Sequence, residues 1–183
     1  MNDHTEGSGV SPGIPARDEE SRAMRRALAL AAAAGAAGDV PVGAVVIDGS
    51  GAVIGEGRNR RESDLDPAGH AEIMALRQAQ RHVQSTHLEN CLLVVTLEPC
   101  AMCATAILSS RVSRVVFGAW EPKTGAAGSV YDILRDGALP YPVPEVAGGV
   151  LEAECAQLLS DFFAARRDAA TSSVSSEGER SSR

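Results

Sequence analysis

The sequence is poor in aromatic side chains, which make up only 3% of its 183 residues. Its core must therefore be built mainly from Val, Ile, Leu and Ala, in a chain long enough for one domain with a sizeable core. It also lacks any run of about 18 strongly apolar residues, so we expect no membrane-spanning helix. These absences leave the ordinary case of a soluble globular domain.

The sequence is short of basic charge, with a formal net charge of −7 and a sequence pI of about 5.1. This balance is unusual for a protein that binds nucleic acid, because phosphate contacts favour basic surfaces. Much of the acidic excess lies in residues 1–20 and 168–183. Arg58, Arg60 and Arg61 can therefore still form a local basic rim, although charge runs are usually just solvated surface.

The two ends of the chain differ in composition from the middle. Residues 1–16 and 168–183 are polar and rich in Ser, Gly or Pro, so we expect two disordered tails around one domain over residues 17–167. Residues 24–41 resemble a secretory signal, but an acidic stretch precedes them and alanine favours a helix. Without a signal segment or a disulfide framework, reduced thiols and a cytoplasmic location are expected.

Helix-like and strand-like segments alternate between the tails. A hairpin is predicted over residues 42–59, with its turn at 48–51. Further strands are predicted at 91–98, 114–119 and 144–149, and helices at 17–37, 70–81, 99–109 and 151–167. This order predicts an α/β fold, a three-layer α/β/α sandwich with a mixed central sheet of about five strands.

Two short motifs carry the chemistry of this sequence. "TLEPCAMC", residues 96–103, follows an apolar strand pattern, and Pro99 suits the first position of a helix. Cys100 is then expected in the first helical turn and Cys103 one turn later on the same side. Unpaired N–H groups at a helix start favour thiolate over thiol.

The other motif is "PAGHAEIMALR", residues 67–77, which places His70 and Glu72 at the start of the preceding helix. One histidine with two cysteines gives zinc three ligands and leaves one tetrahedral position open, as in catalytic sites. We therefore predict one Zn²⁺ per subunit. Glu72 need not bind the metal; it can face the open position and act as general base and acid towards a zinc-activated water.

Neither motif is specific when it stands alone. C-x-x-C also occurs in redox motifs and structural zinc modules, and His-x-Glu is usually a solvated helix start. Their combination in this order, with a strand and a proline before the first cysteine, resembles the signature of zinc-dependent nucleobase deaminases. Cys91 and Cys155 lie in apolar patterns and are expected to be buried thiols.

Longer segments resemble one family in matching order. They are "VPVGAVVI", "NRRESDLDPAGHAEIMALRQA", "LLVVTLEPCAMCATAILSSRVSRVVFGA", "KTGAAGS" and "LLSDFF". They look like the bacterial tRNA-specific adenosine deaminases of the cytidine deaminase-like superfamily, and the resemblance runs from about Arg22 to Arg167. HAE and PCxxC mark the wider superfamily, whereas the last two blocks point to the tRNA enzymes.

The resemblance implies an activity and partners. It implies conversion of adenosine to inosine at the first anticodon position of a tRNA, with an arginine tRNA as the expected substrate. The expected partners are a tRNA anticodon loop and a second copy of the chain, as a homodimer. By motif match, His70, Cys100 and Cys103 would hold zinc and Glu72 would transfer protons.

The resemblance also implies contacts to the RNA. Asn59 falls at the family's base-contacting asparagine, and Val42 would pack on the purine. Glu121 and Lys123 lie in the loop expected at the anticodon, where Glu121 replaces the usual aspartate. Trp120 replaces a basic residue and offers a face on which a base could stack. Without the resemblance, Asn59 would be a turn residue and Val42 simple core.

Other functions compete with this one. The same zinc and glutamate would serve a deaminase of a free base or nucleoside, such as guanine, cytosine or cytidine. A non-catalytic, zinc-stabilised RNA-binding module is a second alternative, in which Glu72 would be dispensable. The apolar face of residues 103–110 suits either the core or a subunit interface.

Overall fold

The computed structural model describes residues 17–180, so the predicted tail over residues 1–16 lies outside the described residues. The helices and strands follow in the order α1 (Arg17–Ala36), β1 (Gly43–Ile47), β2 (Val53–Arg58), α2 (Ala71–Val83), β3 (Leu92–Leu97), α3 (Ala101–Ser109), β4 (Arg114–Ala119), β5 (Glu145–Ala147) and α4 (Glu152–Arg180). Each of these elements was predicted in this order, although the bounds of α3 and α4 differ from those predicted.

The strands form one mixed sheet in the order β2-β1-β3-β4-β5. β1 is antiparallel to both β2 and β3, whereas β3, β4 and β5 run parallel. The β1–β2 turn is held by Asp48, whose carboxylate accepts hydrogen bonds from the backbone nitrogens of Ser50 and Ala52. The predicted hairpin and mixed sheet are both confirmed.

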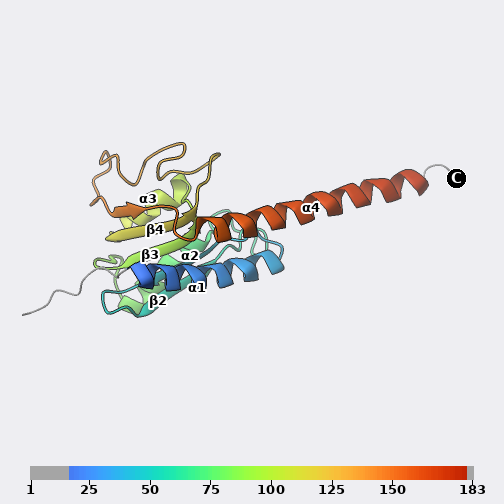
Figure 1. Ribbon diagram of the computed structural model, residues 1–183. Helices are drawn as coiled ribbons and strands as arrows, with labels where there is room; N and C mark the ends of the chain where they lie inside the picture. The colour runs from blue at the N-terminus through green and yellow to red at the C-terminus, as the bar shows by residue number, and fades with distance from the viewer. Residues whose placement is uncertain (1–16, 181–183) are drawn as a thin grey trace, which may run out of the picture.

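Helices cover both faces of this sheet (Figure 1). Neighbouring strand residues point to opposite faces, so Val94 packs in the core beneath α1 and α4, and Leu93 packs in the core beneath α2 and α3. The central strands are buried on both sides, which explains why they read as continuous apolar runs. The predicted three-layer α/β/α sandwich is confirmed.

The final helix is longer than predicted. The sequence predicted its end at residue 167 and a tail beyond, whereas the structure continues α4 to Arg180. Each residue added to an existing helix gains a backbone hydrogen bond, and no proline follows residue 167 to stop it. Figure 1 shows this end of α4 leaving the body of the molecule. Within residues 17–180, no helix combines the length and apolar character needed to cross a membrane.

Candidate active site

His70 lies at the N-cap position of α2, where its backbone is extended. Its carbonyl oxygen accepts the first helical hydrogen bond, 3.0 Å from the backbone nitrogen of Met74. α2 can approach β2 because Gly57 has no side chain: a Cβ there would stand 2.0 Å from the carbonyl oxygen of Ala71. This contact between strand and helix determines where the imidazole lies.

Cys100 occupies the N-cap of α3, and Cys103 is buried in the first turn of that helix. The prediction that Pro99 is the first helical residue is wrong, because it precedes the cap. Its carbonyl oxygen accepts a hydrogen bond from the backbone nitrogen of Ala126 at 2.8 Å. That bond to a distant loop holds Pro99 outside the helix, so the cap moves to Cys100.

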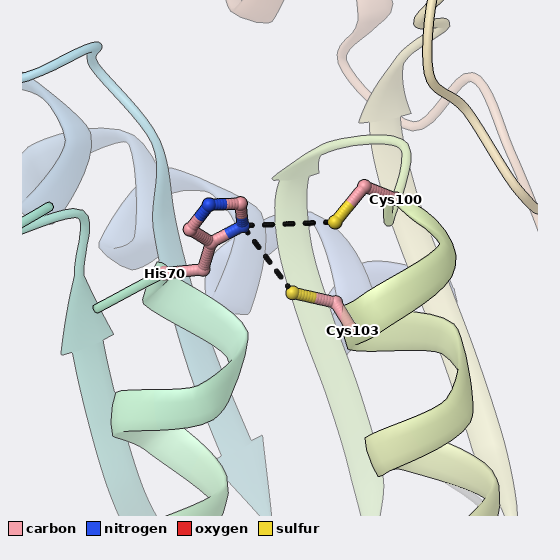
Figure 2. A group of neighbouring side chains, drawn as sticks. All are labelled: His70, Cys100 and Cys103. Carbon is pink, nitrogen blue, oxygen red and sulfur yellow. Dashed lines mark hydrogen bonds between the residues drawn. The ribbon is translucent and has the colours of Figure 1, made fainter. Parts of the chain in front are cut away.

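The three predicted zinc ligands lie together (Figure 2). Nδ1 of His70 is 3.7 Å from Sγ of Cys100 and 3.5 Å from Sγ of Cys103. All three ligand atoms lie within 4.8 Å of one another. Nitrogen and sulfur ligands bound at about 2.0 and 2.3 Å to a tetrahedral ion stand roughly 3.5 Å apart. Both the donor set and its spacing therefore fit zinc.

Contacts among the three ligands shift their pKa values. The hydrogen bond from Cys103 lowers the pKa of Cys100 to about 4, and the same bond raises the pKa of Cys103. The hydrogen bond to Cys100 also raises the pKa of His70. Negative charge therefore collects on sulfur at a helix start, where a cation can bind.

Glu72 lies in the first turn of α2 and is only 4% exposed. Burial raises the pKa of its carboxyl group, and the Cys100 sulfur adds to that effect while His70 opposes it. A carboxyl group with a raised pKa exchanges protons closer to neutral pH than a free one does. Its environment therefore suits Glu72 to proton transfer.

His70, Glu72 and Cys100 open onto a cleft of about 170 Å³. Its other walls include Val40, Val42, Asn59, Arg61, Leu97, Glu121 and Thr124. The apolar side chains of Val40, Val42 and Leu97 offer a surface for a small ring compound, and the polar groups around them can fix its orientation. The structure thus brings His70, Cys100, Glu72, Asn59, Val42 and Glu121 together at one cleft, and the fully buried Cys103 lies beside His70.

Asn59 lines the cleft but also supports the backbone around it. Its side-chain nitrogen donates to the carbonyl oxygen of Val40 at 3.1 Å, and its side-chain oxygen accepts from the backbone nitrogen of Arg61 at 3.4 Å. Its backbone nitrogen donates to the carbonyl oxygen of Val42 at 2.9 Å. Asn59 therefore ties together two segments that line the cleft.

Lys123 does not line the cleft. It lies in a neighbouring shallow groove together with Phe163, Arg166 and Arg167 of α4. Arg166 donates to the carbonyl oxygen of Gly38 at 3.2 Å, so this part of α4 is tied to the segment that follows α1. The groove places three basic residues and an aromatic ring beside one another.

The arginines of the proposed basic rim are not equivalent. Arg58 donates to the carbonyl oxygen of Ala33, and Arg60 is paired with Asp64 at 2.8 Å. Arg61 lies 3.7 Å from the carboxylate of Glu62, but it is exposed and lines the cleft. Of the three, Arg61 is therefore the residue best placed to meet a ligand at the cleft.

Trp120 is partly packed against its own chain. Its ring meets Phe117 edge-on, with 4.8 Å between ring centroids, and a Cβ at Gly148 would stand 2.9 Å from it. Trp120 is 43% exposed but does not line the cleft. A base that stacks on it would therefore lie outside the cleft.

Sequence analysis missed Glu98, which lines the cleft and is only 3% exposed. Burial alone would raise the pKa of its carboxyl group, but hydrogen bonds from Ser129 and from three backbone nitrogens hold that pKa below its ordinary value. The sequence did contain one indication of its role: Glu98 directly follows a strand predicted to be buried, and a charge in such a place needs hydrogen-bond partners.

The chain matches known proteins along most of its length. The family described as "Cytidine and deoxycytidylate deaminase zinc-binding region" matches residues 17–119. The tRNA-specific adenosine deaminase of Haemophilus influenzae is 49% identical over 149 residues, which cover 81% of this chain and 86% of that protein.

Two solved structures share the fold. One, from work on A-to-I editing by tRNA:A34 deaminases at the wobble position, has 37% identity and a TM-score of 0.72, and the match covers 75% of this chain and 99% of that one. The other, a guanine deaminase from Nitrosomonas europaea, has 31% identity and a TM-score of 0.64, over 79% and 84% of the two chains. With its zinc-ligand geometry and these relatives, the chain belongs to the zinc-binding cytidine and deoxycytidylate deaminase family and, within it, to the tRNA-specific adenosine deaminases.

Proposed function

We propose that this protein converts adenosine to inosine at the first anticodon position of a tRNA. The observation that supports this most strongly is the grouping of His70, Cys100 and Cys103 into one metal-ligand cluster, with His70 and Cys100 lining the same cleft as Glu72. The 49% identity to a tRNA-specific adenosine deaminase supports the substrate class. An arginine tRNA is the substrate that the family resemblance predicts.

His70, Cys100 and Cys103 would hold the zinc ion, and their spacing fits it. When bound, the ion supplies a Lewis acid that lowers the pKa of water towards neutrality. In our proposal Glu72 accepts a proton from the attacking water and delivers it to N1 of the purine. The water oxygen adds at C6, and Glu72 then transfers the remaining hydroxyl proton to the C6 amino group. The C6–N bond breaks and ammonia leaves, which converts adenosine to inosine.

We propose that Val42 packs on the purine and that Asn59 contacts one edge of the base. Both residues line the cleft. The side-chain nitrogen of Asn59 has two hydrogens, and one of them is already donated to Val40. The second remains to meet an acceptor on the base. Glu121, which also lines the cleft, would contact the anticodon loop.

The basic groove of Lys123, Arg166 and Arg167 would meet RNA phosphates beside the cleft.

We expect charge reversal at Arg61 to weaken tRNA binding about 10-fold and to reduce its salt dependence, because each lost phosphate contact lowers the slope of log affinity against log salt concentration. Arg81→Glu, at the opposite end of α2 from His70, is the matched control. Equal affinity and salt dependence in Arg61→Glu and Arg81→Glu would remove Arg61 from the RNA contacts.

We also propose a homodimer, as the family resemblance implies. Ile107 and Leu108, on the apolar face of residues 103–110, are buried in the core of the chain itself, so we look for the interface elsewhere. The segment between β4 and β5 instead exposes apolar side chains, including Val130, Tyr131 and Val143. Such a surface is typical of an interface. The cytoplasmic location stays a prediction from the sequence.

Deamination of a free base is the second candidate, and the guanine deaminase with the same fold is the observation in its favour. The decisive experiment measures ammonia release by the purified, zinc-loaded protein. The substrates are an anticodon stem-loop RNA with adenosine at the first anticodon position, guanine, cytosine and cytidine. We expect turnover of the RNA alone. Turnover of a free base, with none of the RNA, would replace the proposed function by the second candidate.

A further inference from the structure

Residues 121–129 supply Glu121 and Thr124 to the cleft but form no regular helix or strand. Gly125 makes an isolated bridge with Cys100. A segment of this kind keeps one conformation only where other groups satisfy its backbone. Those groups therefore determine the shape of this part of the cleft.

The carboxylate of Glu98 satisfies much of that backbone. One oxygen accepts from the backbone nitrogens of Ala127 at 2.9 Å and Ser129 at 3.0 Å. The other accepts from the backbone nitrogen of Glu121 at 3.0 Å and from the hydroxyl of Ser129. The four donors come from both ends of the segment, so one buried side chain holds it closed.

The segment lies directly on this carboxylate. A Cβ at Gly125 would stand 2.4 Å from the carboxyl carbon of Glu98. Beside it, the backbone nitrogen of Ala126 donates to the carbonyl oxygen of Pro99 at 2.8 Å. The turn that leads from β3 to Cys100 therefore carries both a metal ligand and the attachment of this segment.

We propose that Glu98 is a positioning residue for the substrate, which holds residues 121–129 in the conformation that completes the cleft. The inference rests on the proposed function, because it takes the cleft as the site of the base. Glu98 has no part in proton transfer, since both of its oxygens are occupied by the segment. Its loss should therefore weaken substrate binding more than it slows the chemical step.

Glu98→Gln tests the proposal. The four donors of the segment now share two carboxylate oxygens, whereas a glutamine side chain would offer them only one acceptor oxygen. We expect KM for the anticodon stem-loop RNA to rise about 10-fold, as for loss of one hydrogen bond to a charged group, while kcat stays within about 3-fold. Zinc content should not change. Ser129→Ala removes a single donor, so it should raise KM by less, about 2- to 3-fold.

The matched control is Glu20→Gln. Glu20 is also a buried carboxylate, 4% exposed. It is paired with Arg114 at 2.7 Å and lies on α1, at the opposite face of the sheet from α2 and α3. This variant should lose stability without a change in KM.

A second measurement follows the segment itself. Lys123, which lies within it, is the only lysine in the chain. A lysine-specific protease under native conditions therefore reports how often residues 121–129 open. We expect Glu98→Gln to be cleaved about 10-fold faster than the wild type and Glu20→Gln at the wild-type rate.

Wild-type cleavage of Glu98→Gln together with wild-type KM would overturn the positioning role. A rise in KM for Glu20→Gln equal to that for Glu98→Gln would overturn it as well, because a general loss of stability would then explain both. If the wild type leaves tRNA unedited, the proposed function fails, and the cleavage rates still test what Glu98 holds.

Discussion

Replacement of Glu72 by glutamine isolates proton transfer from every other property of the site. The amide keeps the size of the side chain but cannot take up and release protons as a carboxyl group does. General acid–base catalysis contributes about 10²- to 10⁴-fold. Because Glu72 is proposed to act first as base and then as acid, we expect kcat to fall by about 10⁴-fold, or roughly 5.5 kcal/mol in the barrier.

Two neighbouring carboxylates are poorly placed to replace it. The oxygens of Glu98 accept four hydrogen bonds from residues 121–129, and Glu121 accepts one from the backbone nitrogen of Lys123 at 2.8 Å. Single-turnover deamination of the stem-loop RNA measures the loss directly. Zinc content, measured on the same samples, should remain one ion per subunit.

The stability of this variant has a predictable sign. Burial raises the pKa of Glu72, so the ionised carboxylate destabilises the folded protein as pH rises above the pKa of the unfolded chain. Glutamine removes that penalty, so the melting temperature of the zinc-free protein at pH 7 should stay equal or rise. Glu152→Gln, at an exposed carboxylate in α4, is the control. Near-wild-type turnover by zinc-loaded Glu72→Gln would refute the acid–base role and favour the zinc-stabilised RNA-binding module.

Removal of zinc by a strong chelator should abolish turnover and lower the melting temperature, because the ion binds only the folded site. Added zinc should restore both the turnover and the melting temperature. An unchanged melting curve would contradict a metal held by His70, Cys100 and Cys103. Gly57→Ala should destabilise the fold by more than about 3 kcal/mol, because its methyl group would meet the start of α2. Gly35→Ala is the control, because a Cβ there meets its nearest atom at 3.4 Å, and it should be neutral or stabilising. If both glycine variants changed the free energy of denaturant unfolding equally, the packing argument would be contradicted.

The metal ligands could be predicted because they depend on local rules. Cys100 and Cys103 are one helical turn apart, and His70 starts another helix, so spacing and helix starts suffice to place them. Gly57 then lets that helix lie on the sheet, because any side chain at this position would clash with the carbonyl oxygen of Ala71. The fold followed from the same kind of pattern, because strands buried on both faces read as apolar runs.

The parts that escaped prediction depend on distant partners. The residues that donate to Glu98 lie 23 to 31 positions further along the chain, and no local pattern joins them. Pro99 leaves its helix for a similar reason, because its carbonyl pairs with Ala126. Lys123 lines a groove together with residues of α4, and no local pattern in the sequence predicts that neighbourhood.

The most direct test of the central claim is the sequencing of tRNA after incubation with purified protein that carries one zinc ion per subunit. We predict inosine at the first anticodon position of an arginine tRNA, with adenosines elsewhere unchanged. Unmodified tRNA after treatment with the fully zinc-loaded protein would contradict the account.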